Sequence, residues 1–260
     1  MNYDKERLKA IQQRLGIEAD GIFGVGTMSR IEDLLDSAGI GVPDTKPYAL
    51  TISKAGLEEL ISSEISSRVY YKRKLQHPIW PGEKSGITIG IGYDIGQQTR
   101  NQFSKDWSAA IQEPELSRLS ASAGISGEAA NQLLVNLRDI TISLDSASDI
   151  FYTSTLPRYA KKTLKAYPGI ELLPADAQAA LLSLVYNRGT RMTGASRAEM
   201  KTIKPLVANK DLHGIAQQIR AMKRLWDNNA SPGLLKRRDN EAKLLENSSR
   251  DYTDNELLYV

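Results

Sequence analysis

Two carboxyl groups and one hydroxyl group stand where they could act together on a glycosidic bond. Glu64 lies in an amphipathic segment, and Thr88 and Asp94 lie six positions apart in the glycine-rich segment that follows. Hydrolysis of a glycoside needs two carboxyl groups beside the bond: one protonated, to assist the leaving oxygen, and one ionised, to activate water or to attack the sugar carbon. We therefore take Glu64 and Asp94 as the candidate pair.

The segment that carries Glu64 is predicted to be the first helix of a large domain. Apolar residues recur at helical spacing over residues 57–69, and Glu64 lies three and four positions after Ile61 and Leu60, on the same face. A carboxyl group held against apolar surface is disfavoured in its charged form, as a general acid near neutral pH requires. Alternatively, Glu64 only borders the stripe and bonds an arginine such as Arg68.

The segment that carries Thr88 and Asp94 is predicted to form one wall of a cleft. Residues 86–94 alternate β-branched residues with glycine, which is typical of a short sheet edge. The glycines would let a polymer or a water molecule approach the backbone without obstruction by side chains. Taken alone, the pattern is equally compatible with a β-bulge or a hairpin that has no catalytic role.

The rest of the large domain is predicted to be mostly helical. Helical periodicity covers residues 126–150, 157–166, 175–186, 210–226 and 234–245. The expected fold class is therefore mainly α, of the α+β kind: a helical domain with a small β-hairpin lobe, preceded by a small helical module. We assign no element to the C-terminal tail from Asp251.

The small module occupies the first forty residues. Two short amphipathic patterns are separated by a glycine-rich turn at residues 20–24, in which Phe23 is expected to fill the core, and Thr27 is expected to cap the second helix. Glycines and prolines cluster in residues 39–50, which predicts a linker. The predicted division is a module at 1–40, a linker at 41–50 and a catalytic domain at 51–260.

Composition argues against several classes of protein. The 260 residues carry 34 Lys and Arg against 31 Asp and Glu, and both signs are interspersed, so there is no basic stripe for nucleic acid. The absence of cysteine excludes disulfide and thiolate chemistry, and two distant histidines, His77 and His213, argue against a zinc site. We expect no metal and no cofactor.

The N-terminal sequence and the overall hydropathy indicate how the protein is made. Residues 1–7 are charged where a signal peptide would need a continuous apolar run, and no stretch approaches the length of a membrane span. We expect a monomer that is synthesised soluble in the bacterial cytoplasm without a signal peptide, with no stable membrane insertion.

The candidate catalytic segments resemble a known family. Glu64, the pair Tyr70-Tyr71 and the run Thr88-Ile89-Gly90-Ile91-Gly92-Tyr93 resemble the pattern of phage-type lysozymes: a helix-borne glutamate, a β-hairpin and a Thr-Ile-Gly-x-Gly run. In ordinary members the aspartate precedes the threonine, whereas residues 72–85 contain no aspartate here. An aspartate six positions after the threonine is similar instead to the lysozyme-like domain of pesticin-type bacteriocins. The resemblance implies that Glu64 is the acid, Asp94 its carboxylate partner and Thr88 the residue that positions the attacking water.

Two later segments extend the resemblance. Residues 180–189 resemble the family's helix that ends in Asn-x-Gly beside the cleft, so Asn187 and Arg188, together with Tyr93, are candidate substrate-binding residues. Asn187 could orient a sugar amide or simply cap the helix. Residues 233–241 resemble the closing Gly-Leu-x-x-Arg-Arg-x-x-Glu signature. By their spacing, the charged residues of that signature are expected to form an exposed, salt-bridged helix face; they are Arg237, Arg238 and Glu241.

The N-terminal module has a resemblance of its own. Residues 8–16, followed by 19–24 and Thr27, are similar to a peptidoglycan-binding domain, a three-helix module of which about forty residues are matched here. Tethering an enzyme to an insoluble polymer raises its local concentration on that polymer.

Together, these resemblances imply a glycoside hydrolase that acts on bacterial peptidoglycan. The expected reaction is hydrolysis of the β-1,4 bond between N-acetylmuramic acid and N-acetylglucosamine, and the expected setting is a phage endolysin that acts in the periplasm or cell wall after release or delivery. A bacteriocin or an injected effector would have the same chemistry. The alternatives are a lytic transglycosylase, which needs only the glutamate, and a non-catalytic cell-wall-binding protein.

Overall fold

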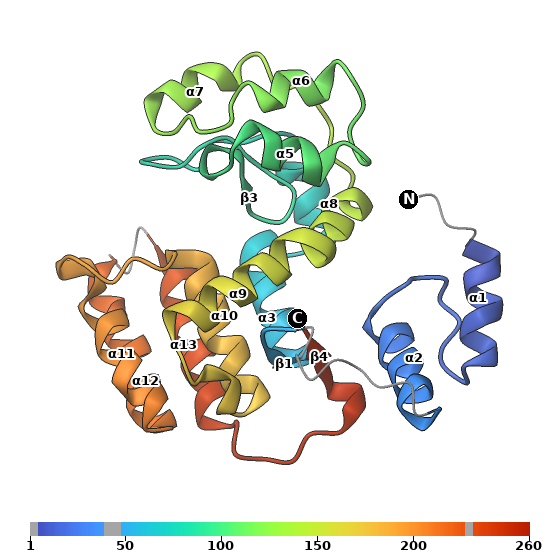
Figure 1. Ribbon diagram of the computed structural model, residues 1–260. Coiled ribbons are helices and arrows are strands. Elements are labelled where there is room, and N and C mark those ends of the chain that lie inside the picture. Colours follow the sequence, from blue (N-terminus) through green and yellow to red (C-terminus); the bar gives the residue numbers. More distant parts are fainter. Residues whose placement is uncertain (1–4, 39–47, 227–230) are drawn as a thin grey trace.

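The computed structural model describes residues 5–38, 48–226 and 231–260 (Figure 1). Within these ranges the chain is mainly helical, with two small antiparallel sheets, so the predicted fold class is confirmed. The principal helices after the N-terminal unit are α3 (Lys54–Ile65), α4 (Arg68–Tyr70), α5 (Arg100–Trp107), α6 (Glu115–Ser120), α7 (Glu128–Leu134), α8 (Leu144–Ile150), α9 (Leu156–Ala166), α10 (Ala175–Arg188), α11 (Ala198–Ala208), α12 (Leu212–Ala221) and α13 (Pro232–Glu246). None of the helices described is long and apolar enough to cross a membrane.

The N-terminal unit consists of α1 (Lys5–Arg14) and α2 (Val25–Ser37), joined by the predicted turn. Buried Gln12 holds this turn: its amide nitrogen donates to Asp20 Oδ1 at 2.6 Å and to Thr27 Oγ1 at 3.0 Å. Two expectations were wrong. Thr27 lies within the first turn of α2 instead of capping it, and Phe23 is 50% exposed, because the two described helices bury little apolar surface between them.

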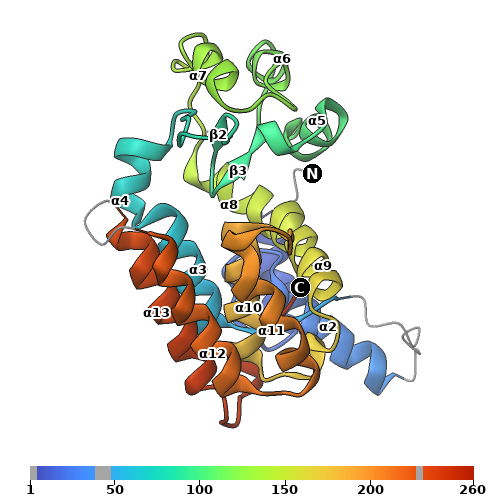
Figure 2. The same ribbon diagram turned by 90° about the vertical axis from the view of Figure 1, so that its left-hand side faces the viewer.

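The core of the large domain is built around α10. Every residue from Ala175 to Tyr186 is buried, because the helix packs against β1 (Thr51–Ser53), α3, α9 and α13. Its buried residues are mostly alanine and leucine, which suits a helix that is surrounded by others, and the buried polar exceptions are Asp176, Gln178 and Ser183. Helices α11 and α12 extend this lobe beyond α13 (Figures 1 and 2).

The two ends of the large domain are joined in one sheet. Strand β1 pairs antiparallel with β4 (Leu257–Tyr259), and Leu50 and Val260 exchange two backbone hydrogen bonds beside it. The tail to which the sequence assigned no element is therefore part of the fold, because it completes β1 and buries Leu258. Most of the predicted linker lies outside the described residues.

The second lobe contains β2 (Thr88–Ile89), β3 (Tyr93–Asp94) and helices α5, α6 and α7. It lies at the opposite end of the large domain from α11 and α12, and α8, a π-helical turn (Phe151–Thr155) and α9 run continuously from one lobe to the other (Figures 1 and 2). This connecting helix and α3 bring residues of both lobes to one place.

Two predicted helices are interrupted. The segment 126–150 forms α7 and α8 with an irregular stretch between them, where Ile142 donates from its backbone to Gln76 and the Ile140 carbonyl contacts His77. Tertiary hydrogen bonds to residues near position 76 thus replace the helical ones. The segment 57–69 ends at Ile65, because Ser66 adopts a φ of 56°. The other helical segments form within a few residues of their predicted limits, although 210–226 finishes as a short 3-10 turn after α12.

Candidate active site

Glu64 lies in the last turn of α3, at the junction of the two lobes. Its side chain is 17% exposed, and its Oε1 accepts a hydrogen bond of 2.7 Å from Nη1 of Arg237, which lies on α13. The alternative partner considered from the sequence was an arginine such as Arg68. An arginine does bind Glu64, but it comes from the far end of the chain.

Arg237 belongs to a buried network of charges beneath Glu64. Its guanidinium also donates to the Ser183 carbonyl at 3.0 Å and to Glu241 Oε1 at 3.3 Å, and Arg238 donates to the same Glu241 oxygen at 2.7 Å. Burial lowers the pKa of Arg237, but the charges of Glu64 and Glu241 more than offset this and raise it overall. Arg237 is therefore a permanent cation that fixes the Glu64 carboxylate.

The expectation that Arg237, Arg238 and Glu241 form an exposed helix face was wrong. All three are buried, and Glu241 is fully so. The spacing correctly places them together, but α13 turns this face inward against α3 and α10. Their mutual ion pairs and the contacts with Ser183 offset the cost of burial, although Nε and Nη1 of Arg238 and Oε2 of Glu241 have no hydrogen-bond partner among the described residues.

The hairpin turn is pressed against Glu64. Strands β2 and β3 are connected by Gly90, Ile91 and Gly92, and both glycines adopt positive φ values, 60° and 68°. A β-carbon added at Gly92 would lie 2.9 Å from Glu64 Oε2 and 3.1 Å from the ring of Tyr186. Glycine is therefore required at position 92 for two reasons: the positive φ of the backbone and the close approach of the Glu64 carboxylate.

Thr88 and Asp94 are directly paired across the hairpin, so their side chains project from the same face of the sheet. Asp94 is also a helix cap: its Oδ1 accepts from the backbone of Gly96 at 2.8 Å, and its Oδ2 accepts from Gly86 at 3.3 Å and from the Gln97 amide at 3.0 Å. A carboxylate offers about four acceptor positions, so roughly one remains for water or substrate.

Two tyrosines that the sequence analysis did not single out complete this region. The hydroxyl of Tyr186 on α10 donates to the Ile91 carbonyl at 2.6 Å. The ring centroid of Tyr159 on α9 lies 4.5 Å from that of Tyr186. The pKa of Tyr159 is raised to about 12 by burial, with smaller contributions from the charges of Asp94 and Glu64. Its hydroxyl has no hydrogen-bond partner among the described residues and is not sealed from solvent. A neutral phenol therefore stands near both carboxylates.

The three candidate substrate-binding residues lie in different surroundings. The ring of Tyr93 is buried against Trp107, and its hydroxyl donates to Asp106 at 2.7 Å. Asn187 is exposed near the end of α10. Arg188 donates to the Ser196 carbonyl, and its guanidinium lies over the ring of Trp226. Burial, and to a smaller extent the charges of neighbouring arginines, lowers the pKa of Arg188 to about 10.

No cluster of three or more acidic, histidine or cysteine side chains that could hold a metal ion occurs in the part of the chain that the structure describes. The charged groups at the site are Glu64 and Glu241, which pair with Arg237, and Asp94, which accepts hydrogen bonds from amide groups. The chemistry available from them is proton transfer and the positioning of water.

Residues 49–238 match a protein family described as "Domain of unknown function (DUF8812)", and the chain belongs to this family. No curated protein matches the chain. The matched range contains Glu64, the hairpin, Tyr159 and Arg237, whereas the N-terminal unit lies outside it. Most of the residues gathered at the site are therefore part of the family's domain, and Glu241 lies three positions beyond the matched range.

Replacement of Arg237 by methionine is expected to lower the free energy of unfolding by about 3–5 kcal/mol, because Glu64 and Glu241 would lose the cation buried between them. Urea denaturation would measure this loss. The matched control is Arg220→Met, which breaks an exposed pair with Glu246 and is expected to cost about 1 kcal/mol or less. Equal losses in the two variants would contradict a special role for the buried pair.

Proposed function

We propose that this protein is a peptidoglycan muramidase, which hydrolyses the β-1,4 bond between N-acetylmuramic acid and N-acetylglucosamine. The observation that carries the proposal is the position of the Glu64 carboxylate. Arg237 holds it against the turn of a hairpin on which Thr88 and Asp94 stand side by side. Glycoside hydrolysis uses two carboxyl groups that flank the scissile bond, and Glu64 and Asp94 are the two that this proposal assigns.

In this proposal the two oxygens of Glu64 have different tasks. Oε1 is bound to Arg237, and Oε2 lies on the side of Gly92, where an added β-carbon would come within 2.9 Å of it. The proposal requires Glu64 to act in its protonated form, with Oε1 accepting from Arg237 and the proton on Oε2; this proton passes to the leaving glycosidic oxygen as its bond to the anomeric carbon breaks. Asp94 and the hydroxyl of Thr88 hold a water molecule, whose oxygen joins the anomeric carbon while its proton passes to Asp94.

A lytic transglycosylase is the second candidate, and one observation favours it. Three of the acceptor positions of Asp94 are occupied by Gly86, Gly96 and Gln97, so this carboxylate already has a structural task. A transglycosylase needs only the glutamate and closes an anhydro-sugar by internal attack. The two reactions are therefore distinguished by what Asp94 contributes.

The resemblance of the N-terminal unit supports a further part of the proposal, that this unit attaches the enzyme to the cell wall. Large apolar side chains are exposed on its described residues, among them Phe23 and Met28. On the same sequence resemblance we propose a phage endolysin that acts in the periplasm or cell wall after its release.

The variant Glu64→Gln is expected to lower the rate of digestion of purified peptidoglycan by about 10²–10⁴-fold, because the amide cannot donate the proton that a general acid supplies. Mass analysis of the released fragments would give the reaction type: reducing ends for a hydrolase and anhydro ends for a transglycosylase. If neither the parent nor the variant released fragments, the chain would be a non-catalytic wall-binding protein and the proposal would be wrong.

The variant Asp94→Asn is expected to lower the hydrolytic rate by about 10²-fold or more if Asp94 accepts the proton from water. The change keeps one oxygen that can accept from Gly96. Gln97→Ala is the control, since it removes a donor to Asp94 without touching the carboxylate. A threefold effect or less in Asp94→Asn, with anhydro products, would establish the transglycosylase instead.

The variant Tyr159→Phe is expected to lower kcat by about three- to tenfold, the loss of one hydrogen bond to a sugar hydroxyl or to water. Because the pKa of Tyr159 lies at about 12, the ratio of parent to variant rates should stay constant between about pH 5 and pH 9. Tyr152→Phe, at an exposed position on the same connecting helix, is the control. A ratio that changed with pH in this range would contradict the assignment of Tyr159 as a neutral hydroxyl.

A further inference from the structure

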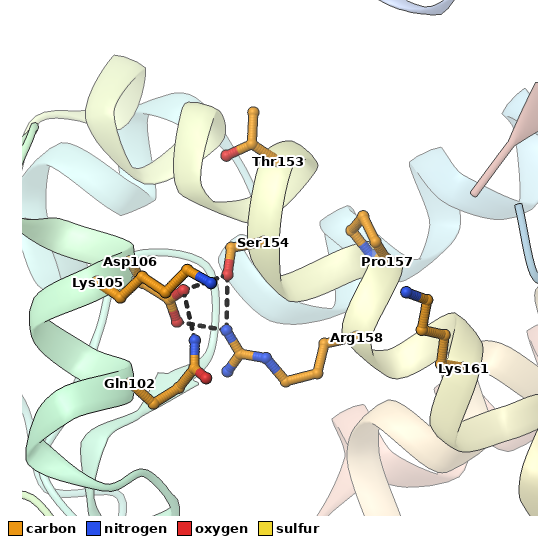
Figure 3. Close-up of a pocket in the computed structure, with 8 residues that line it drawn as sticks. All are labelled: Gln102, Lys105, Asp106, Thr153, Ser154, Pro157, Arg158 and Lys161. Atoms are coloured by element: carbon orange, nitrogen blue, oxygen red, sulfur yellow. Dashed lines mark hydrogen bonds and ion pairs between the residues drawn. The ribbon is translucent and has the colours of Figure 1, made fainter. Parts of the chain in front are cut away.

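A pocket of about 410 Å³ opens between α5 and the connecting helix (Figure 3). The lining residues are spaced three and four positions apart on each helix, so each helix contributes one face to the pocket. The volume lies within the range of small-ligand sites. The lining residues are Gln102, Lys105 and Asp106 from α5, and Thr153, Ser154, Pro157, Arg158 and Lys161 from the connecting helix.

The floor of this pocket is preorganised around Asp106. Its side chain is 4% exposed, and it accepts hydrogen bonds from Tyr93 at 2.7 Å, Gln102 at 2.8 Å and Ser154 at 2.6 Å, and from Arg158. Burial raises the pKa of Asp106, but these donors more than offset this and lower it overall. Asp106 and Arg158 therefore neutralise each other.

The rim of the pocket carries positive charge that no described residue balances. Lys105 and Lys161 are exposed, and neither forms an ion pair or a hydrogen bond within the part of the chain that the structure describes. In Figure 3 they stand on opposite sides of the pocket, with their ammonium groups turned towards it. Helix α9 adds Lys162 and Lys165 and contains no acidic residue. The free charge of the pocket thus favours an anion.

Hydrogen bonds connect the residues that line the pocket with the strand that carries Asp94. Tyr93, which binds Asp106, directly precedes Asp94 in β3. Gln98 joins the two sites, because its amide nitrogen donates to the Asp94 carbonyl at 3.2 Å and its oxygen accepts from Arg158 at 2.8 Å. Arg158 and Tyr159 are consecutive residues of α9. A polymer bound at Asp94 could therefore place a side branch in the pocket.

We propose that this pocket binds a carboxylate of the peptide that branches from the glycan strand, between Lys105 and Lys161. The inference rests on the proposed function, which makes peptidoglycan the substrate. Its glycan backbone is uncharged, whereas its peptide branches carry carboxylates at regular intervals. The pocket would thus select glycan that bears peptide and would set the register of the strand relative to Glu64.

The test compares Lys105→Ala/Lys161→Ala with Lys201→Ala/Lys204→Ala, a double variant that removes two exposed lysines from α11. Both are made in the Glu64→Gln background, so that binding is measured without turnover. Binding is measured by co-sedimentation with intact sacculi, with sacculi whose peptide carboxylates have been converted to amides, and with walls that retain phosphate-bearing polymers. A soluble stem peptide is also titrated into each variant and followed by NMR.

Loss of both pocket lysines is expected to weaken binding to intact sacculi and to the stem peptide by about three- to tenfold, since each exposed ion pair contributes a factor of a few. On amidated sacculi the pocket variant should bind as tightly as its parent, and the α11 variant should bind like the parent on every substrate. An equal loss on amidated sacculi, or no loss on intact sacculi, would overturn the proposal, and a loss confined to phosphate-bearing walls would assign the pocket to those polymers. Because the peptide titration does not depend on cleavage, failure of the muramidase assay and failure of this site would be seen separately.

Discussion

The buried cation of Arg237 is the interaction on which the candidate site depends. It lies between two carboxylates, Glu64 on α3 and Glu241 on its own helix, and it is anchored to Ser183 on α10. An unpaired charge could not remain in this position, because the desolvation of a guanidinium is compensated only by opposite charge and well-directed acceptors. The three helices that form the floor of the site are therefore held together by the same contacts that orient Glu64.

A second constraint comes from the hairpin turn. At Gly92 there is no room for a side chain between the backbone and Glu64, and the hydroxyl of Tyr186 donates a hydrogen bond to the neighbouring Ile91 carbonyl. The turn is thus fixed to both α3 and α10, although it belongs to the other lobe. The pairing of Thr88 with Asp94 then follows from the register of a three-residue turn, and the two side chains that could hold water emerge together.

The connecting helix relates the candidate site to the neighbouring pocket. On one side it presents Tyr159 near both carboxylates, and on an adjacent side Ser154 and Arg158 bind Asp106. A helix turns by about 100° per residue, so two consecutive residues can serve two neighbouring surfaces. This geometry allows one polymer chain to be held by its backbone at one surface and by its branch at the other.

The sequence by itself determined the features that depend on neighbours in the chain. The periodicity of α3 placed Glu64 beside an apolar stripe, the glycines of residues 86–94 indicated a hairpin, and the periodicity of residues 175–186 predicted the helix α10. The tertiary structure alone decided which face of α13 is buried, because the partner that makes this burial tolerable, Glu64, stands 173 positions away. It likewise decided the break between α7 and α8 and the pairing of β4 with β1, since hydrogen bonds to distant segments there outweigh local preference.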